Sequence, residues 1–168
     1  AQAESHARAG REAQARIALR LARELDAPKA GIDAAEALLR MDAAAQAGIG
    51  ALLDAAESAH AAGRLQDGVD AALPLYQRVL ALQPRNQRAV EGREDALSDL
   101  LQPVPGLLAR GDLAGAAARV QAAERFDPGH ADLPESRAGL ARALEQRAAR
   151  IRQALAGKQH ARAAEACA

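Results

Sequence analysis

Four histidines and one cysteine are the residues that could bind a metal ion or attack a substrate. His6, His60, His130 and His160 lie far apart in the sequence, and no HExxH motif or paired Cys/His spacing unites them. His160 and Cys167 would share one face of a helix, but no third group that could orient a nucleophile accompanies them. We therefore expect no metal site, no cofactor and no covalent catalysis.

Paired carboxyl groups are the other common route to catalysis. Glu94 and Asp95, and likewise Asp132 and Glu135, lie among arginines at helical neighbour distances, which is typical of surface ion pairs. Because no strand precedes a glycine-rich loop, the 13 glycines are interpreted as helix terminators and not as a phosphate site. His130 follows an Asp-Pro-Gly turn and is expected to help start the next helix. The sequence therefore predicts that the chain is not an enzyme.

The composition predicts an all-α fold. Of the 168 residues, 48 are Ala and 22 are Leu, both strong helix formers. Four Ile, five Val, one Phe, one Tyr and no Trp leave little material for a β-sheet. Zero net charge and the near absence of aromatic residues argue against nucleic-acid binding. No apolar run approaches the roughly 18 residues of a membrane span, so direct membrane insertion is not expected.

Two segments of the sequence align with each other and indicate internal repetition. The first runs from Gly63 to Pro84, and the second runs from Gly111 to Pro128. In each segment, we expect one helix to end at the glycine and a second helix to run back to the proline-closed turn. The first copy is longer by about one helical turn, which we place around residues 66–69.

Further residues predict how the helices begin and break. Asp70 is expected to cap the second helix of the first copy. Pro103 and Pro105 predict a break, because each removes an amide donor and restricts the preceding residue. After the second copy, apolar residues at helical spacing predict one long helix over 133–155 that ends near Gly157.

Small side chains in the repeats predict close helix contacts. Ala116 and Ala123 belong to one stripe of the second copy and are expected where two helices meet. Tyr76 is expected to pack between helices of the first copy with its hydroxyl near solvent.

The remaining glycines suggest how the chain is divided. Gly48 and Gly50 are interpreted as a helix break, and Gly10 and Gly157 as the turns of incomplete terminal copies. The predicted regions are an N-terminal helical pair (1–50), two repeats (51–130), and a long helix with a truncated or capping repeat (131–168).

The second copy carries a recognisable pattern, formed by Gly111, Asp112, Leu113, Ala116, Val120, Ala123, Asp127 and Pro128. This pattern resembles the second half of a tetratricopeptide repeat, over roughly residues 51–130. The prolines of the two copies are 44 residues apart, whereas the family usually repeats at about 34 residues, which indicates a divergent long-helix variant. The resemblance implies an α-solenoid of antiparallel helix pairs that forms a right-handed superhelix.

The resemblance also implies a function in protein–protein interaction. In that family, the first helix of each pair lines a concave surface that binds a peptide or a partner protein. The positions carried over are Leu53, Glu57, His60, Leu101, Pro105 and Leu108. The leucines among them would equally suit the hydrophobic core.

Two other functions remain open. The chain could serve as a structural spacer or oligomerisation domain, with weak self-association through the long C-terminal helix. It could also be the regulatory helical part of a larger bacterial enzyme. A looser resemblance to helical regions of bacterial envelope proteins, including kinase-linked ones, favours the periplasmic side of a Gram-negative envelope over the cytoplasm.

Overall fold

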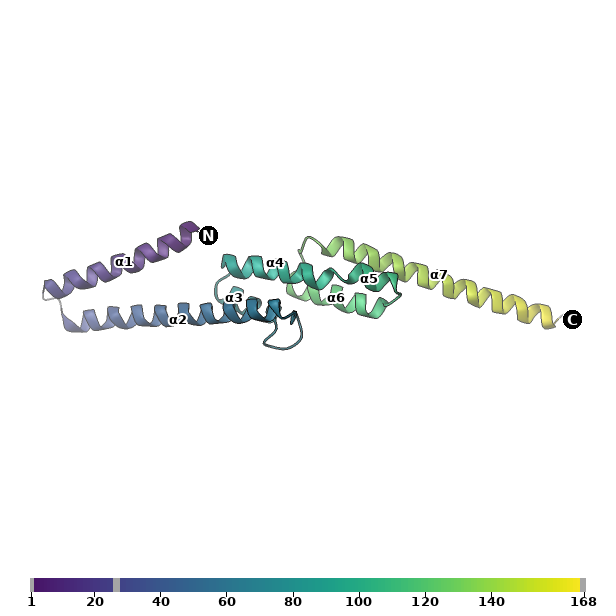
Figure 1. Ribbon diagram of the computed structural model, residues 1–168, viewed down its shortest axis with the longest axis horizontal. Coiled ribbons are helices and arrows are strands. Elements are labelled where there is room, and N and C mark those ends of the chain that lie inside the picture. Colours follow the sequence, from purple (N-terminus) through teal and green to yellow (C-terminus); the bar gives the residue numbers. More distant parts are fainter. Residues whose placement is uncertain (1, 26–27, 167–168) are drawn as a thin grey trace. The chain divides into compact units, whose positions relative to one another are not determined.

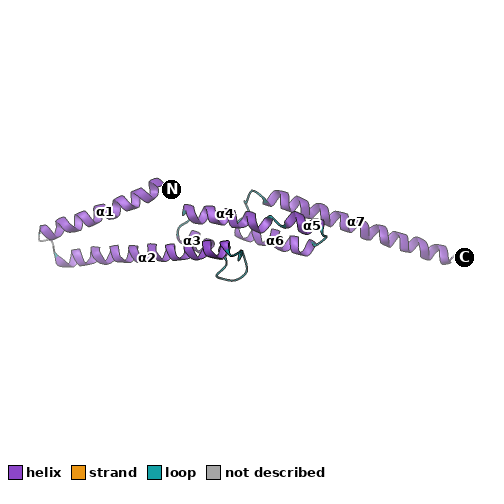
Figure 2. Cartoon of the chain, in the orientation of Figure 1, coloured by secondary structure: helices purple, strands orange, loops and turns teal. Residues whose placement is uncertain are grey.

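The computed structural model describes residues 2–25 and 28–166, with side chains for 11–25 and 28–158. Within these ranges the chain forms seven helices and no strand, which confirms the predicted all-α fold (Figure 2). The helices are α1 (Gln2–Glu24), α2 (Lys29–Ala61), α3 (Ala72–Leu82), α4 (Gln87–Leu101), α5 (Val104–Ala109), α6 (Leu113–Phe126) and α7 (Leu133–Ala166). None of the helices in the described part is both long enough and apolar enough to cross a membrane.

The chain divides into two compact units, and the division falls inside α4. Unit 1 comprises Ala1–Arg93 and unit 2 comprises Glu94–Ala168. This division differs from the boundaries expected at residues 50 and 130. Residue 50 lies within the continuous helix α2, so no linker separates the N-terminal helical pair from the first repeat.

The core of unit 1 forms where α3 packs against the C-terminal part of α2 (Figure 1). Its largest fully buried side chains are Leu73, Tyr76 and Val79, all from α3. Alanines on α2, including Ala56 and Ala59, are also fully buried and let the two helices approach closely. The prediction that the Tyr76 hydroxyl lies near solvent is wrong, because only 1% of this residue is exposed.

Tyr76 is enclosed because Gly92 on α4 leaves room for its ring. A Cβ atom added at Gly92 would lie 2.5 Å from Oη and 2.6 Å from Cε1 of Tyr76, far inside van der Waals contact. Gly92 is therefore a packing residue in the interior of a helix and not a helix terminator. The interpretation of all 13 glycines as terminators is wrong at this position.

The first predicted helix end, at Gly63, is confirmed. Gly63 has a φ of 70°, and its N–H donates to the carbonyl of His60 at 2.8 Å. The N–H of Arg64 donates to the carbonyl of Ala59 at 2.9 Å, which completes a Schellman motif. The αL conformation explains why glycine occupies this position.

The segment that follows Gly63 forms a loop instead of the expected extra helical turn. This loop doubles back, so that the carbonyls of Arg64 and Leu65 accept the N–H groups of Ala72 and Leu73, each at 2.9 Å. The first amides of α3 are therefore satisfied by backbone atoms. The prediction that Asp70 caps α3 is wrong, because the N-cap residue is Ala71 and no side chain caps the helix.

The second turn, at Gly111, follows the prediction closely. Gly111 has a φ of 78°, its N–H donates to Leu108 at 3.0 Å, and the N–H of Asp112 donates to Leu107 at 2.9 Å. The Asp112 side chain then caps α6 by accepting the N–H of Gly115 at 2.8 Å. The expected break at Pro103 and Pro105 is also confirmed, since α4 ends at Leu101 and α5 begins at Val104.

The core of unit 2 is formed by α5, α6, the end of α4 and the start of α7. Leu97, Leu100, Val104 and Leu133 contribute its largest fully buried side chains. Ala116 and Ala123 are also fully buried, as expected for residues at a close helix contact. Each fully buried Leu contributes roughly 1.5–3 kcal/mol of hydrophobic stabilisation.

Several predicted helix breaks are wrong. Gly10 lies within α1, Gly48 and Gly50 lie within α2, and Gly157 lies within α7, which continues to Ala166. An isolated glycine costs a helix only about 1 kcal/mol relative to Ala, and alanine-rich flanks offset that loss. The two incomplete terminal copies therefore lack the turns on which they depended.

Candidate partner-binding surface

An apolar cleft lies in unit 1, between the antiparallel helices α1 and α2. It has a volume of about 430 Å³, which falls in the range of ligand-binding pockets. Its lining residues are Ala15, Ala18, Leu19, Ala22, Pro28, Gly31, Ile32, Ala35 and Leu39. The cleft is wide because alanine and glycine occupy most of these positions.

Sequence spacing explains why these residues face one another. Ala15, Ala18, Leu19 and Ala22 recur at three and four residues on α1, so they share one stripe. The same spacing relates the lining residues of α2, from Gly31 to Leu39. Both helices therefore direct a narrow apolar face into the cleft.

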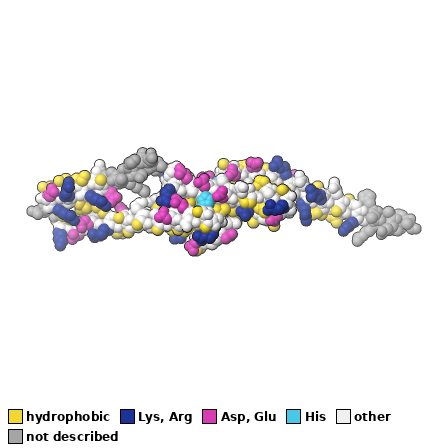
Figure 3. Space-filling view, viewed as in Figure 1, with side chains coloured by type: hydrophobic (Ala, Val, Ile, Leu, Met, Phe, Trp, Pro, Cys, Tyr) yellow, Lys and Arg dark blue, Asp and Glu magenta, His cyan; other side chains and the backbone are white. Residues whose placement is uncertain are grey.

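The two helices that form the cleft also carry ion pairs and exposed apolar side chains. Arg23 on α1 pairs with Glu36 on α2, and Arg40 lies 3.9 Å from the same carboxylate. Large hydrophobic side chains of α1 and α2 outside the lining are about half exposed or more, namely Ile17, Leu21, Leu38 and Met41. In the face drawn in Figure 3, hydrophobic side chains extend along the region of α1 and α2.

The cleft has the chemistry of a recognition surface. Its lining contains no titratable side chain, so nothing in the lining can transfer a proton or act as a nucleophile. An apolar face of a helix or an extended peptide would be complementary to it. The alternation of small and large side chains matches the way helix ridges fit into grooves.

The residues predicted to bind a partner in unit 1 have other contacts. Leu53 is only 4% exposed and belongs to the core between α2 and α3. His60 is half-buried near the end of α2 and already has an interaction partner. Glu57 is exposed, but Arg88 of α4 binds its carboxylate.

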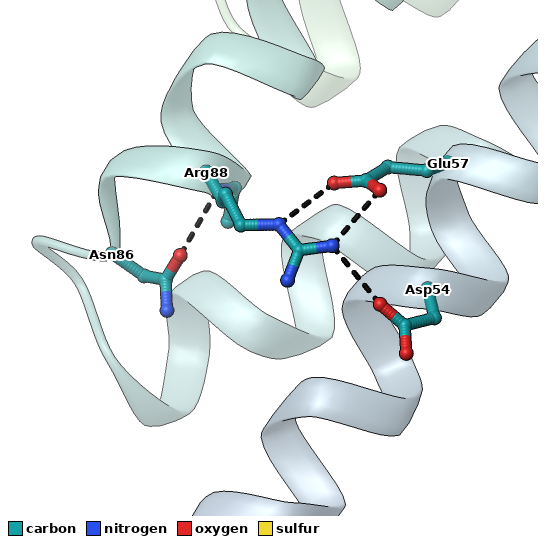
Figure 4. Close-up of polar contacts among 5 residues, drawn as sticks. Asp54, Glu57, Asn86 and Arg88 are labelled. Carbon is teal, nitrogen blue, oxygen red and sulfur yellow. Dashed lines mark hydrogen bonds and ion pairs between the residues drawn. The ribbon is translucent and has the colours of Figure 1, made fainter.

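Arg88 holds two carboxylates of α2 (Figure 4). Its Nε and Nη2 donate to Oε1 and Oε2 of Glu57 at 2.8 and 2.9 Å, and Nη2 also donates to Asp54 at 2.9 Å. The hydrogen bond from Arg88 lowers the pKa of Glu57, and the two carboxylates raise the pKa of Arg88. Asn86 caps the same end of α4 by accepting the N–H of Ala89 at 3.1 Å.

These contacts give Glu57 a structural function. The fork of the guanidinium matches the carboxylate in a two-point contact, which fixes α4 on α2. Because Glu57 and Arg88 are 48% and 51% exposed, water screens the interaction and limits its energy to about 1 kcal/mol or less.

The three residues predicted in unit 2 lie in different environments. Leu101 is only 3% exposed and belongs to the core, while Pro105 is exposed in the first turn of α5. Leu108 is half-buried, and its Cδ1 would lie 3.2 Å from a Cβ added at Gly139 of α7. The predicted residues therefore divide between two units, and the three leucines take part in internal packing.

His130 is a buried polar residue in the turn before α7, as the sequence predicted, and it also contacts α4, which the sequence did not reveal. It is only 3% exposed, its Nδ1 accepts the N–H of Asp132 at 3.2 Å, and its Nε2 contacts the carbonyl of Glu94 at 3.2 Å. With Nδ1 as an acceptor, Nε2 is the ring nitrogen that can donate to this carbonyl. His130 thus ties the turn before α7 to α4, alongside a 2.7 Å hydrogen bond from Ser98 to Asp132.

Metal binding finds no support in the described residues, where no group of three or more His, Cys, Asp or Glu side chains could hold an ion. His6, His160 and Cys167 lie outside the part whose side chains the structure describes.

Comparisons with protein-family models, curated proteins and solved structures found no match for this chain.

The sequence did carry a signal for the cleft. Ala15, Ala18 and Ala22 repeat at helical spacing opposite a similar stripe in residues 31–39. Spacing alone does not show which residues of two helices face each other, since that depends on how the chain turns between them. The cleft could therefore be located only after the helices had been placed.

Proposed function

We propose that this chain is a protein–protein interaction module built from tetratricopeptide-like antiparallel helix pairs. The cleft between α1 and α2 is its binding surface, and its ligand is an apolar helix face or peptide of a partner protein. The observation that carries this proposal is the wholly apolar and non-titratable lining of the cleft.

The binding surface in this proposal differs from the concave face that the family resemblance implies. Leu53 and Leu101 stabilise the two cores and are not available to a partner. The cleft offers apolar side chains that are already partly solvated, so binding a partner would remove them from water. Gathered hydrophobic side chains on a surface commonly mark an interaction site.

The solenoid arrangement is part of the same proposal. Two helix pairs with Schellman turns at Gly63 and Gly111 support it, because each pair must bury one face against a neighbouring element.

An affinity capture with matched variants tests the binding proposal. Ala18→Glu places a charge in the cleft, whereas Ala34→Glu places the same charge on an exposed position of α2 outside the lining. Both variants should keep the helical circular dichroism of the parent. The proposal predicts that Ala18→Glu loses a protein partner that the parent and Ala34→Glu retain.

Other results would favour a different function. If all three proteins capture the same partners, the cleft is not the binding surface. If the parent captures no specific partner, the spacer function or a regulatory function within a larger enzyme is favoured over an interaction module.

A further inference from the structure

The distal part of α7, residues 141–158, extends beyond the packed part of unit 2. Leu133, at the start of α7, is fully buried, whereas Leu144, Ile151 and Leu155 are 50%, 51% and 56% exposed. These three are the large hydrophobic side chains of unit 2 that its described core leaves exposed. We define this segment, 141–158, as the distal helix.

The exposed apolar residues form one straight stripe. Leu144 and Leu155 are separated by 11 residues, or about three helical turns, and Ile151 lies between them on the same side. At about 100° per residue, the three side chains fall within an arc of roughly 40°. Alanines at 141 and 148 widen this stripe on one side.

Charge is strongly segregated along unit 2. The distal helix holds five basic side chains and one acidic side chain, a net charge of +4. Residues 94–140 hold four basic and eight acidic side chains, a net charge of −4. The basic residues of the distal helix are Arg142, Arg147, Arg150, Arg152 and Lys158, and all five are exposed.

None of these basic groups makes an ion pair with another described residue, and only Arg152 makes a hydrogen bond. Arg152 donates to the carbonyl of Ala148 in its own helix, whereas Arg137, nearer the core, pairs with Glu124. Arg147 and Lys158 lie on one side of the apolar stripe and Arg152 lies on the other, by the same helical geometry. Cations therefore border an exposed apolar stripe on both sides.

The exposed apolar stripe and the cations that border it restrict what kind of surface can bind the distal helix. Pairing with the distal helix of a second copy would bring together two segments of net charge +4, which opposes the pairing of one distal helix with another. A complementary surface must be negative around an apolar interior, and the interface of an anionic bilayer has that character. Basic side chains spread around the circumference suit such a diffuse negative surface, because each finds counter-charge without a dedicated carboxylate.

We infer that the distal helix of α7 docks on the surface of anionic lipid bilayers. Leu144, Ile151 and Leu155 enter the interfacial region, and the arginines that border them contact lipid phosphates. The helix lies on the surface without spanning the bilayer. This inference is independent of the cleft in unit 1.

Flotation with lipid vesicles tests the inference on the full chain. The probes are vesicles of phosphatidylcholine alone and vesicles that also contain about 30% phosphatidylglycerol. We expect binding to the anionic vesicles at least about tenfold tighter than to the neutral ones, with a further loss of about tenfold in high salt.

Two double variants with equal net charge provide the control. Arg147→Gln with Arg150→Gln removes two cations from the distal helix, and Arg110→Gln with Arg125→Gln removes two exposed cations elsewhere in unit 2. The first pair should weaken binding to anionic vesicles about tenfold or more, and the second pair should leave it nearly unchanged. Ile151→Gln, at a half-exposed position, should also weaken binding without loss of helix content.

The inference is overturned if the parent binds both kinds of vesicle equally or binds neither. Equal losses in the two double variants would also overturn it, because they would indicate general charge attraction. An acidic protein that binds the distal helix when anionic vesicles do not would assign this surface to a different class of partner.

Discussion

Two helical hairpins, the first formed by α2 and α3 and the second by α5 and α6, end their first helices in the same way but begin their second helices differently. At Gly63 and at Gly111, a glycine with φ near 70–80° closes a Schellman motif. In the second hairpin, Asp112 then caps α6 with its carboxylate. In the first hairpin, the carbonyls of Arg64 and Leu65 satisfy the first amides of α3.

This difference shows two solutions to one requirement. The first amides of a helix need acceptors, and either a side chain or a folded-back loop can supply them. The loop of the first hairpin therefore replaces a missing capping side chain. The helices that follow the two hairpins also differ in what their glycines contact. Gly92 of α4 packs on the rigid ring of Tyr76, whereas Gly139 of α7 packs on the flexible side chain of Leu108.

The largest expected effect comes from the glycines that follow the hairpins. Gly92→Ala should destabilise unit 1 by roughly 3 kcal/mol, because the new Cβ overlaps the buried ring of Tyr76. Gly139→Ala should change stability by less than about 1 kcal/mol, since Leu108 can move and Ala favours the helix. Urea unfolding followed by circular dichroism measures both.

Equal effects at Gly92 and Gly139 would contradict this account of Tyr76. The double variant Gly92→Ala with Tyr76→Leu gives a second check. Removing the ring should restore part of the stability that Gly92→Ala loses, and an additive result would show that the two residues do not interact.

Buried alanines in the second hairpin should produce the next largest effect. Ala116→Leu and Ala123→Leu each overpack a fully buried position and should cost about 2 kcal/mol. Ala118→Leu changes an exposed position of the same helix and should be almost neutral. Thermal melts in which all three variants match the parent would show that α6 is placed wrongly.

The capping difference predicts a smaller and asymmetric effect. Asp112→Ala removes the acceptor of the Gly115 amide and should cost about 1 kcal/mol. Asp70→Ala should cost almost nothing, because no side chain caps α3. A loss at Asp70 as large as that at Asp112, in matched unfolding curves, would refute the backbone cap.

The smallest effect concerns Arg88 and Glu57, which join α4 to α2 after the first hairpin. A double-mutant cycle with Arg88→Gln and Glu57→Gln should give a coupling of about 0.5 kcal/mol near neutral pH. Folding lowers the pKa of Glu57 below its ordinary value of 4.5. The coupling is therefore fully present above that value and is lost as the pH falls through the lowered pKa.

Unfolding measurements at neutral pH and at about pH 3 check the sign of this dependence. Unchanged coupling in acid would mean that the Glu57 carboxylate does not contribute through its charge.

Much of the fold could be predicted from the sequence. Alanine and leucine content predicted the helical class, and the glycines at 63 and 111 and the proline at 103 marked true ends. The other glycines led to wrong predictions of helix ends. The free energy that a single glycine costs a long helix is smaller than the stabilisation that packing and alanine-rich flanks provide. At position 92 a glycine is required inside a helix, because the ring of Tyr76, 16 residues away in the sequence, occupies the space that a Cβ atom would need.

The candidate site was harder to predict for a related reason. Leu53 and Leu101 are apolar at helical spacing, and spacing does not distinguish a core position from a binding position. Glu57 of α2 pairs with Arg88 of α4, and these residues become neighbours only when the chain folds. The cleft depends on how α1 and α2 face each other, and His130 became a buried residue through contacts with α4.

Site-specific photo-crosslinking most directly tests the claim that the α1–α2 cleft binds a partner protein. A photoreactive amino acid would replace Ala18 in the cleft, and the same residue would replace the exposed Ala118 of α6 as the control. If the cleft binds a partner, position 18 gives a discrete covalent adduct with one protein and position 118 gives none. Adducts of equal yield at both positions, or an adduct from position 118 alone, would contradict it.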